Sequence, residues 1–120
     1  MDAGRFCFTR RCRLLRPAEF QRVFQGGCKS GDGQLLVIAR RNECGYARLG
    51  LAISLKATGT AVVRNRIKRV VRESFRHHRA TLGNLDFVVT GRAGLARKTN
   101  QELRTALTKH WVALVECKKS

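Results

Sequence analysis

Acidic residues are scarce in this chain of 120 residues, where 8 Asp and Glu stand against 25 Lys and Arg. The resulting formal net charge of +17 requires that an acidic ligand be part of any account of function. Proline occurs only once, and 43% of the residues are hydrophobic, so the chain is not a disordered basic tail. Its length suits one folded domain with a buried core and leaves little room for a second.

Long apolar runs are also missing. No stretch approaches the roughly 18 to 20 continuous apolar residues of a membrane span, and residues 1–13 lack the apolar middle and cleavage site of a signal peptide. These absences predict a cytoplasmic protein without a membrane partner. The five cysteines form no Cys-x-x-Cys pair, which predicts reduced, unliganded thiols and no metal site; they are Cys7, Cys12, Cys28, Cys44 and Cys117.

Hydrophobic periodicity and turn residues predict alternating helices and strands. Pro17 suits a first helical turn, and Thr99 with Glu102 has the spacing of a capping box. The strands over 34–40 and 47–54 are expected to run antiparallel. In chain order, the predicted elements are a helix over 17–25, a weakly signalled strand over 28–30, strands over 34–40 and 47–54, a helix over 61–79, a strand over 85–90 and a helix over 99–116.

The helix over 61–79 separates apolar from charged residues by helical period. Its apolar face is predicted to comprise Val63, Ile67, Val70, Val71, Ser74, Phe75 and His78. Its opposite arc is predicted to comprise Asn65, Lys68, Arg69, Arg72, Arg76 and Arg79, with Arg66 just beyond this arc and Arg64 on the border of the apolar face. Like charges at i and i+4 repel unless an anion lies along them, and arginine, at 18 of the 25 basic residues, suits bidentate phosphate contacts. The pattern favours a nucleic acid over a merely solvated charged face.

Three smaller features leave alternatives open. Asn65 is either a local helix cap or a directional hydrogen-bonding group among the cations. Phe20 and Phe24, at helical spacing, are either core residues or a platform on which unpaired bases stack. The histidines form no defined acid–base pair with each other or with a glutamate, so no catalytic residue is predicted in the chain; the groups considered are His77, His78, His110, Glu73 and Glu102.

The run from Ala61 to Phe75, AVVRNRIKRVVRESF, closely resembles the signature of the bacterial ribonuclease P protein subunit, whose hallmark is this Arg-Asn-Arg helix. Other parts of the chain are similar to the family in the same order. They are Arg-Leu at 13–14, FQRVF at 20–24, RLGL at 48–51 leading to Lys56, and DFVV at 86–89. The resemblance spans roughly residues 13–115.

The resemblance implies an α+β fold, a single two-layer domain in the order αβββαβα. Its mixed sheet of about four strands would contain a left-handed βαβ crossover, as in the second domain of ribosomal protein S5. Right-handed crossovers are the general rule, so sequence periodicity alone does not suggest this feature. The expected boundaries are a basic arm over 1–15, the RNA-binding domain over 16–117 and a basic tail over 118–120.

The family also implies a function. Its catalytic centre belongs to a large RNA subunit, which uses Mg²⁺ to remove the 5′ leader of precursor tRNA, and the protein binds that RNA and holds the leader. One protein is expected per RNA. The residues that match the RNA-binding motif are Arg64, Asn65, Arg66, Lys68, Arg69, Arg72 and Arg76. The residues that match the leader groove are Phe20, Phe24, Leu36, Ile38, Arg48 and Lys56. The Lys-Lys pair common in the family is Leu55-Lys56 here.

Three other functions are compatible with a basic domain of this size. A ribosomal or other structural RNA-binding protein would share the charge without needing a leader groove. A helix-turn-helix regulator would place residues 61–79 in the major groove of DNA, and would require a short preceding helix where 47–54 is predicted as a strand. An autonomous nuclease would cleave RNA without an RNA subunit.

Overall fold

The computed structural model describes residues 13–14, 16–42 and 45–119, with the side chains of residues 118 and 119 left out. Most of the predicted arm over 1–15 therefore lies outside the described residues. Its end packs on the domain, because the Leu14 N–H donates to the Leu49 carbonyl at 2.8 Å and Leu14 is buried. The elements are α1 (Pro17–Gly26), β1 (Cys28–Gly31), β2 (Leu35–Arg41), β3 (Arg48–Ala52), α2 (Leu55–Thr58), α3 (Ala61–Leu82), β4 (Leu85–Gly91), η2 (Leu95–Arg97) and α4 (Asn100–Lys119).

The four strands form one mixed sheet in the order β1-β2-β4-β3. β2 pairs antiparallel with both β1 and β4, whereas β3 pairs parallel with β4. The predicted strands over 34–40 and 47–54 do run antiparallel, but they are not neighbours, because β4 lies between them. Local alternation of residues specifies a strand and its faces but not its partner.

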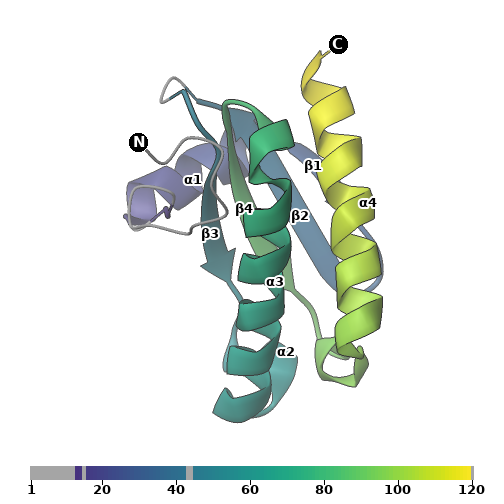
Figure 1. The fold of residues 1–120 in the computed structure, drawn as a ribbon. Helices are drawn as coiled ribbons and strands as arrows, with labels where there is room; N and C mark the ends of the chain where they lie inside the picture. The colour runs from purple at the N-terminus through teal and green to yellow at the C-terminus, as the bar shows by residue number, and fades with distance from the viewer. Residues whose placement is uncertain (1–12, 15, 43–44, 120) are drawn as a thin grey trace.

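The crossover from β3 through α3 to β4 is left-handed, as the family resemblance implied. In Figure 1, β3 runs downward, α3 returns upward in front of the sheet, and β4 runs downward on the right of β3. A right-handed crossover with its helix in front would place β4 on the left of β3 in this view. The fold is α+β, as predicted.

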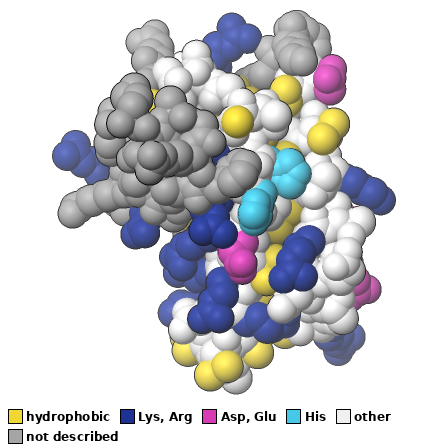
Figure 2. Space-filling view, in the orientation of Figure 1, with side chains coloured by type: hydrophobic (Ala, Val, Ile, Leu, Met, Phe, Trp, Pro, Cys, Tyr) yellow, Lys and Arg dark blue, Asp and Glu magenta, His cyan; other side chains and the backbone are white. Residues whose placement is uncertain are grey.

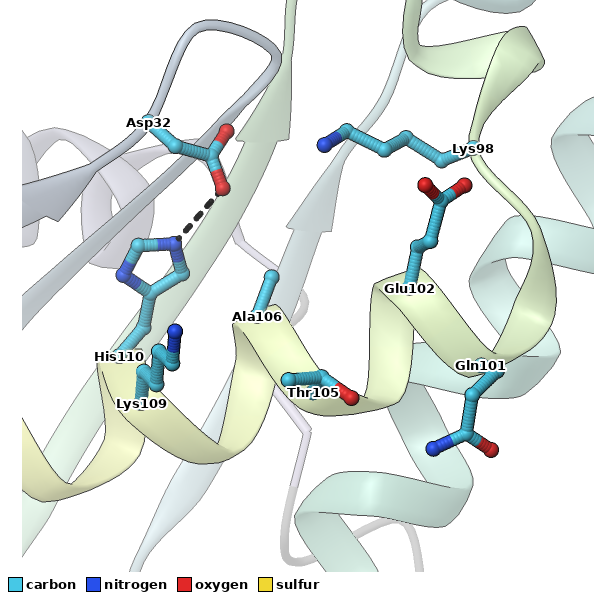
Figure 3. Close-up of a pocket in the computed structure, with 8 residues that line it drawn as sticks. All are labelled: Asp32, Lys98, Gln101, Glu102, Thr105, Ala106, Lys109 and His110. Atoms are coloured by element: carbon cyan, nitrogen blue, oxygen red, sulfur yellow. Dashed lines mark hydrogen bonds and ion pairs between the residues drawn. The ribbon is translucent and has the colours of Figure 1, made fainter.

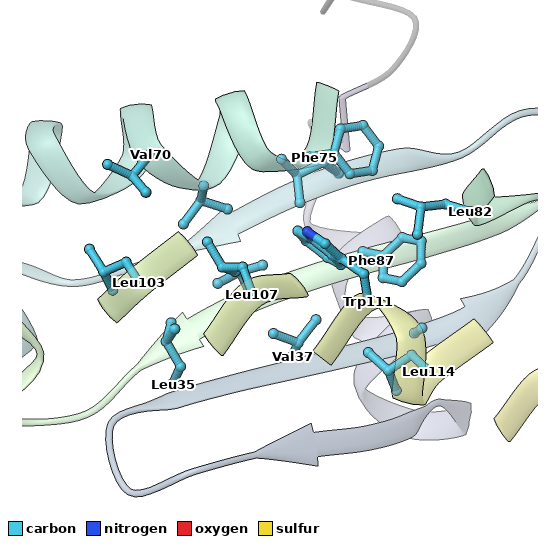
Figure 4. Close-up of a cluster of buried hydrophobic side chains, with 14 of the residues drawn as sticks. Leu35, Val37, Val70, Phe75, Leu82, Phe87, Leu103, Leu107, Trp111 and Leu114 are labelled. Atoms are coloured by element: carbon cyan, nitrogen blue, oxygen red, sulfur yellow. The ribbon is translucent and has the colours of Figure 1, made fainter. Parts of the chain in front are cut away.

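Helices cover both faces of the sheet unequally, which makes three layers where the resemblance implied two. α3 and α4 lie side by side over one face, and α1 lies behind the other (Figure 1). The larger core fills the space between the sheet and the helix pair, where Phe75, Phe87 and Trp111 meet edge to face with ring centroids 5.2–6.2 Å apart (Figure 4). The indole Nε1–H of Trp111 donates to the hydroxyl of Ser74 at 2.9 Å, which satisfies a buried donor.

Short polar side chains begin three of the helices. The Thr60 hydroxyl accepts from the Val63 N–H at 3.2 Å and caps α3, and Thr99 and Glu102 form the predicted capping box at the start of α4. The one-turn helix α2 was not predicted. Ser54 caps it by accepting from the Ala57 N–H at 3.2 Å, a signal too short to distinguish from a turn.

The prediction of five reduced thiols is wrong for two of them, because Cys28 on β1 and Cys117 on α4 form a disulfide. The two residues are 89 positions apart in sequence, so their spacing did not reveal that α4 lies against β1. α4 also continues to Lys119 instead of ending near 116, so most of the predicted tail over 118–120 belongs to this helix.

Candidate RNA-binding surfaces

The basic face of α3 is the first candidate surface. The residues predicted for its apolar face are buried at Ile67, Val70, Val71, Ser74 and Phe75, and half-buried at Val63 and His78. On the opposite side, Asn65 and Arg69 are exposed and the other basic residues are half-buried. Figure 2 shows Lys and Arg side chains gathered along the course of α3. The sequence prediction of one core face and one cationic face is confirmed.

Burial and neighbouring positive charges disfavour the charged forms of two residues on this face. Partial burial, followed by the neighbouring guanidinium groups of Arg72 and Arg64, lowers the pKa of Lys68 below its usual value. Partial burial and then Arg13 likewise lower the pKa of Arg72. Both shifts mean that added positive charge is disfavoured here, and a phosphate group would relieve that cost.

The members of the Arg-Asn-Arg motif differ in their surroundings. Arg66 is held within the chain, because its guanidinium donates to Asn100 Oδ1 at 2.6 Å and to the carbonyls of Ala96 and Lys98 at 3.3 Å each. Arg66 thus ties α3 to the segment that leads into α4. Arg64 has a buried Nε without a hydrogen-bond acceptor among the described residues, and Arg76 shares this feature.

Asn65 is exposed in the second turn of α3, and the helix cap is Thr60. The capping alternative for Asn65 is therefore wrong. Its side chain is accessible for a directional hydrogen bond to a ligand, which stays a prediction.

The second candidate surface is the face of the sheet that α1 covers. Phe20 packs on Gly50 so closely that a Cβ there would lie 2.8 Å from the ring atom Cε2. Phe24, one turn later, has 41% of its surface exposed. The two alternatives, core residue and stacking platform, therefore apply to different residues. Phe20 is partly core, whereas Phe24 presents an exposed ring of the kind on which bases stack.

The remaining predicted groove residues differ in how far they are exposed. Leu36 is half-buried and packs with Phe20 around the smaller core formed by Leu14, Val23, Ile38 and Val88. Ile38 is only 1% exposed, so it supports this surface from beneath and does not line it. Lys56 is exposed on α2, which packs against α3 and η2, so the elements that hold the basic helix also position Lys56.

Arg48 was predicted as a groove residue, and its guanidinium is bound within the protein. Its Nε and Nη2 donate to the two carboxylate oxygens of Asp86 at 2.8 and 2.7 Å, and its Nη1 donates to Glu19 at 3.0 Å. Asn42 Nδ2 also donates to Asp86, at 2.7 Å. The sequence pattern did not predict this network. One feature of the sequence could have indicated it: the carboxylate of Asp86 stands at the start of a strand of otherwise apolar, buried residues.

The histidines occupy separate structural contacts. His78 Nδ1 lies 2.8 Å from the carbonyl of Ser74 on its own helix. His110 is buried, with Nδ1 2.7 Å from the Ser30 hydroxyl and Nε2 3.4 Å from Asp32. Hydrogen bonds from the Leu35 and Gln34 N–H groups and from His110 outweigh burial and lower the pKa of Asp32. Glu73 and Glu102, the glutamates considered with the histidines, take part in neither of these contacts.

A pocket of about 410 Å³ opens beside His110, between the β1–β2 turn and α4 (Figure 3). Basic and acidic side chains alternate around it, including Lys98, Lys109, Asp32 and Glu102. This mixture of charges does not select one ligand chemistry.

Among the described residues, none of the helices combines the length and the apolar composition that a membrane span requires.

Comparison with known proteins decides the family. The family model described as Ribonuclease P matches residues 8–115. The chain belongs to the ribonuclease P protein family. It is 49% identical over 107 residues to the ribonuclease P protein component of Methylococcus capsulatus, which covers 89% of this chain and 84% of that protein. It is 43% identical to the component of Pseudoalteromonas atlantica over 118 residues, 98% of each chain.

Solved structures of the family share the fold. The ribonuclease P protein of Staphylococcus aureus superimposes with a TM-score of 0.77 at 30% identity, covering 90% of this chain and 95% of that one. The protein of Thermotoga maritima gives a TM-score of 0.73 at 30% identity, covering 87% and 96%. The chain is thus the protein subunit of ribonuclease P, an endoribonuclease of tRNA 5′ processing, and its partner is the ribonuclease P RNA. Family membership excludes the three alternative functions, which were a ribosomal protein, a DNA-binding regulator and an autonomous nuclease.

Proposed function

We propose that the subunit binds the catalytic RNA and the 5′ end of the substrate through α3, and holds the single-stranded 5′ leader of precursor tRNA on the α1 face of the sheet. The observation that carries this proposal is the division of α3 into a buried apolar face and a basic face. The residues proposed for RNA contact on α3 are Arg64, Asn65, Lys68, Arg69, Arg72 and Arg76, with Arg66 holding the neighbouring segment in place.

The proposed leader surface combines an exposed aromatic ring with partly buried apolar side chains. Phe24 contributes the exposed aromatic ring, and Phe20 and Leu36 form the apolar surface beside it. Stacking of bases on aromatic rings tolerates any sequence, because every base has a π-face. Such a surface would add affinity for precursor over mature tRNA, which lacks the leader.

Magnesium belongs to this proposal as an ion held by the RNA subunit and the substrate, where the catalytic centre is proposed to lie. The described residues contain no group of three or more His, Cys, Asp or Glu side chains placed to hold a metal ion. A protein with a formal net charge of +17 attracts phosphates and repels cations. By neutralising phosphates of the catalytic RNA and substrate, the protein would lower the magnesium concentration that cleavage requires.

We further propose a 1:1 ribonucleoprotein acting in the cytoplasm, where precursor tRNA is processed. Native mass spectrometry of the reconstituted complex measures this stoichiometry directly. A peak with two proteins per RNA would contradict it.

The decisive experiment is reconstitution of the chain with a bacterial ribonuclease P RNA. Cleavage of precursor tRNA at low magnesium, and dissociation constants for precursor and mature tRNA, are measured with and without protein. We expect the protein to tighten binding of precursor more than of mature tRNA, by an amount that shrinks as the leader is shortened. Equal affinity for both tRNAs would overturn the proposed leader site.

A further inference from the structure

A row of three charged residues crosses the sheet beneath α1. Arg40 on β2 and Arg48 on β3 are both in register with Asp86 on β4, so the order across the three strands is Arg40, Asp86, Arg48. Opposite charges at directly paired positions stabilise neighbouring strands. Asp86, at the centre of the row, is one of 8 acidic residues in a chain with 25 basic ones.

Both arginines of the row also reach α1. Arg48 Nη1 donates to Glu19 Oε2 at 3.0 Å near the start of the helix. Arg40 Nη1 donates to the carbonyl oxygen of Arg22 at 2.9 Å, nearer its end. The helix is therefore attached to the sheet at two points along its length by groups on different strands.

Apolar packing alone holds α1 weakly. Among its ten residues only Val23 is buried, whereas α3 buries five apolar side chains among its 22 residues. Polar contacts therefore contribute a larger share of the orientation of α1 than they do for the helices on the opposite face. Arg48 is well suited to this role, because its side chain is 14% exposed and those of Glu19 and Asp86 are 27% and 5% exposed.

We infer that Arg48 is a positioning residue, which acts with Glu19 and Arg40 to set the place of α1 over the sheet. Its guanidinium does not bind leader phosphate. The inference rests on the proposed leader site and deepens it: Phe24 and Leu36 lie on the two elements whose spacing this network determines. A leader strand would meet both only when α1 keeps that spacing.

Glu19→Gln separates this role from direct phosphate binding. The glutamine retains an oxygen that can accept from the Arg16 N–H, as Glu19 Oε1 does at 3.0 Å, so the helix start keeps its cap. It loses the charge that binds Arg48. If Arg48 or its surroundings bound phosphate directly, removal of a nearby carboxylate would strengthen leader binding. The positioning role predicts the opposite sign.

Glu102→Gln is the matched control. Glu102 has the same position in the capping box of α4, accepts from the Thr99 N–H at 2.8 Å, and lies on the other face of the sheet. Both variants remove one negative charge, so the change in net charge is the same in the two.

The test measures precursor dissociation constants of holoenzymes with full-length, shortened and absent leaders. We expect Glu19→Gln to weaken binding of the full-length precursor by about two- to fivefold, with no effect when the leader is absent, and Glu102→Gln to change neither. Unchanged or tighter precursor binding by Glu19→Gln would overturn the inference. Equal weakening without a leader would overturn it too. A wild-type holoenzyme indifferent to leader length would instead overturn the proposed leader site.

A measurement on the protein without RNA keeps the inference testable on its own. Amide hydrogen exchange in α1 is expected to accelerate in Glu19→Gln, while exchange in α3 and α4 stays at the wild-type rate. Arg48→Lys supplies the complementary variant, because it keeps the positive charge but loses the bidentate bond to Asp86. Wild-type exchange in α1 for both variants would show that the network does not position the helix.

Discussion

The two faces of the sheet are built from different interactions. Among the described residues, the cluster between the sheet and the pair α3 and α4 contains 19 buried hydrophobic residues, whereas the cluster under α1 contains four. The first holds the three mutually packed aromatics and the Trp111–Ser74 hydrogen bond. The second depends on the ion pairs of Arg48 and leaves Phe24 open.

This difference shows how a small domain combines stability with a binding surface. A helix held by a few directional polar contacts leaves apolar and aromatic side chains accessible beside it, which a closely packed helix would cover. The helix pair on the opposite face supplies the burial that the fold requires. The basic residues of α3 lie opposite its apolar side, so they do not occupy the larger core.

Matched leucine truncations should show the largest difference between the faces. Leu107→Ala removes a side chain that is 0% exposed in the larger core, and we expect the free energy of unfolding to fall by about 4 kcal/mol. Leu14→Ala, in the smaller core at 4% exposure, should cost about 2 kcal/mol, because its neighbours can close around the gap. Urea denaturation measures both values. Equal losses would remove the energetic contrast between the faces.

Removal of Arg48 should have the next largest effect. Arg48→Met leaves the buried carboxylate of Asp86 without its guanidinium partner, and we expect a loss of about 2 kcal/mol, reduced by the partial exposure of the pair. Arg69→Met on the exposed basic face is the control and should change the free energy of unfolding by less than about 0.5 kcal/mol. Similar denaturation midpoints for the two variants would contradict a structural role for Arg48.

Truncation of Phe24 should separate binding from stability. Because 41% of its surface is exposed, we expect Phe24→Ala to destabilise the fold by under about 1 kcal/mol. Loss of one stacked base should weaken precursor binding by about tenfold and leave mature tRNA binding unchanged. Filter binding with both tRNAs measures the ratio. A parallel loss for mature tRNA would place Phe24 outside the leader site.

The basic face of α3 should respond mainly through salt dependence. Arg69→Ala is expected to leave the fold intact and to reduce the slope of log K against log salt for RNA binding by about 0.7 to 0.9, the loss of one phosphate contact. Arg104→Ala, on the exposed side of α4, is the control and should leave the slope unchanged. Identical slopes for both variants would show that α3 is not the preferred contact surface.

The smallest expected effect is a pH dependence of RNA binding through Lys68. In the free protein, burial and the neighbouring arginines lower the pKa of this amine, so it loses its charge at lower pH than an ordinary lysine. A bound phosphate favours the charged form, so the pKa should rise on RNA binding and affinity should fall as pH increases through the free-state pKa. Nuclear magnetic resonance of labelled lysine measures both values, and an unchanged pKa would place Lys68 away from phosphate.

Most elements, and the division of α3, could be predicted because they depend on local spacing. The buried side of α3 follows from the positions of Ile67, Val70 and Phe75 at helical intervals, and the capping box from Thr99 and Glu102. The family, through the Arg-Asn-Arg helix, supplied the crossover hand and the candidate residues. These features are encoded in neighbouring residues or in a recognisable motif.

The sequence by itself determined a basic single domain, its helices and strands, and one amphipathic helix with a cationic face. Only the tertiary structure decided that β4 separates β2 from β3, that Cys28 meets Cys117, and that Arg48 donates to both Asp86 and Glu19. The physical reason is the range of the interactions. Periodicity reports which side of an element is buried, whereas strand order, disulfides and ion pairs join residues tens of positions apart, and no local pattern specifies their partners.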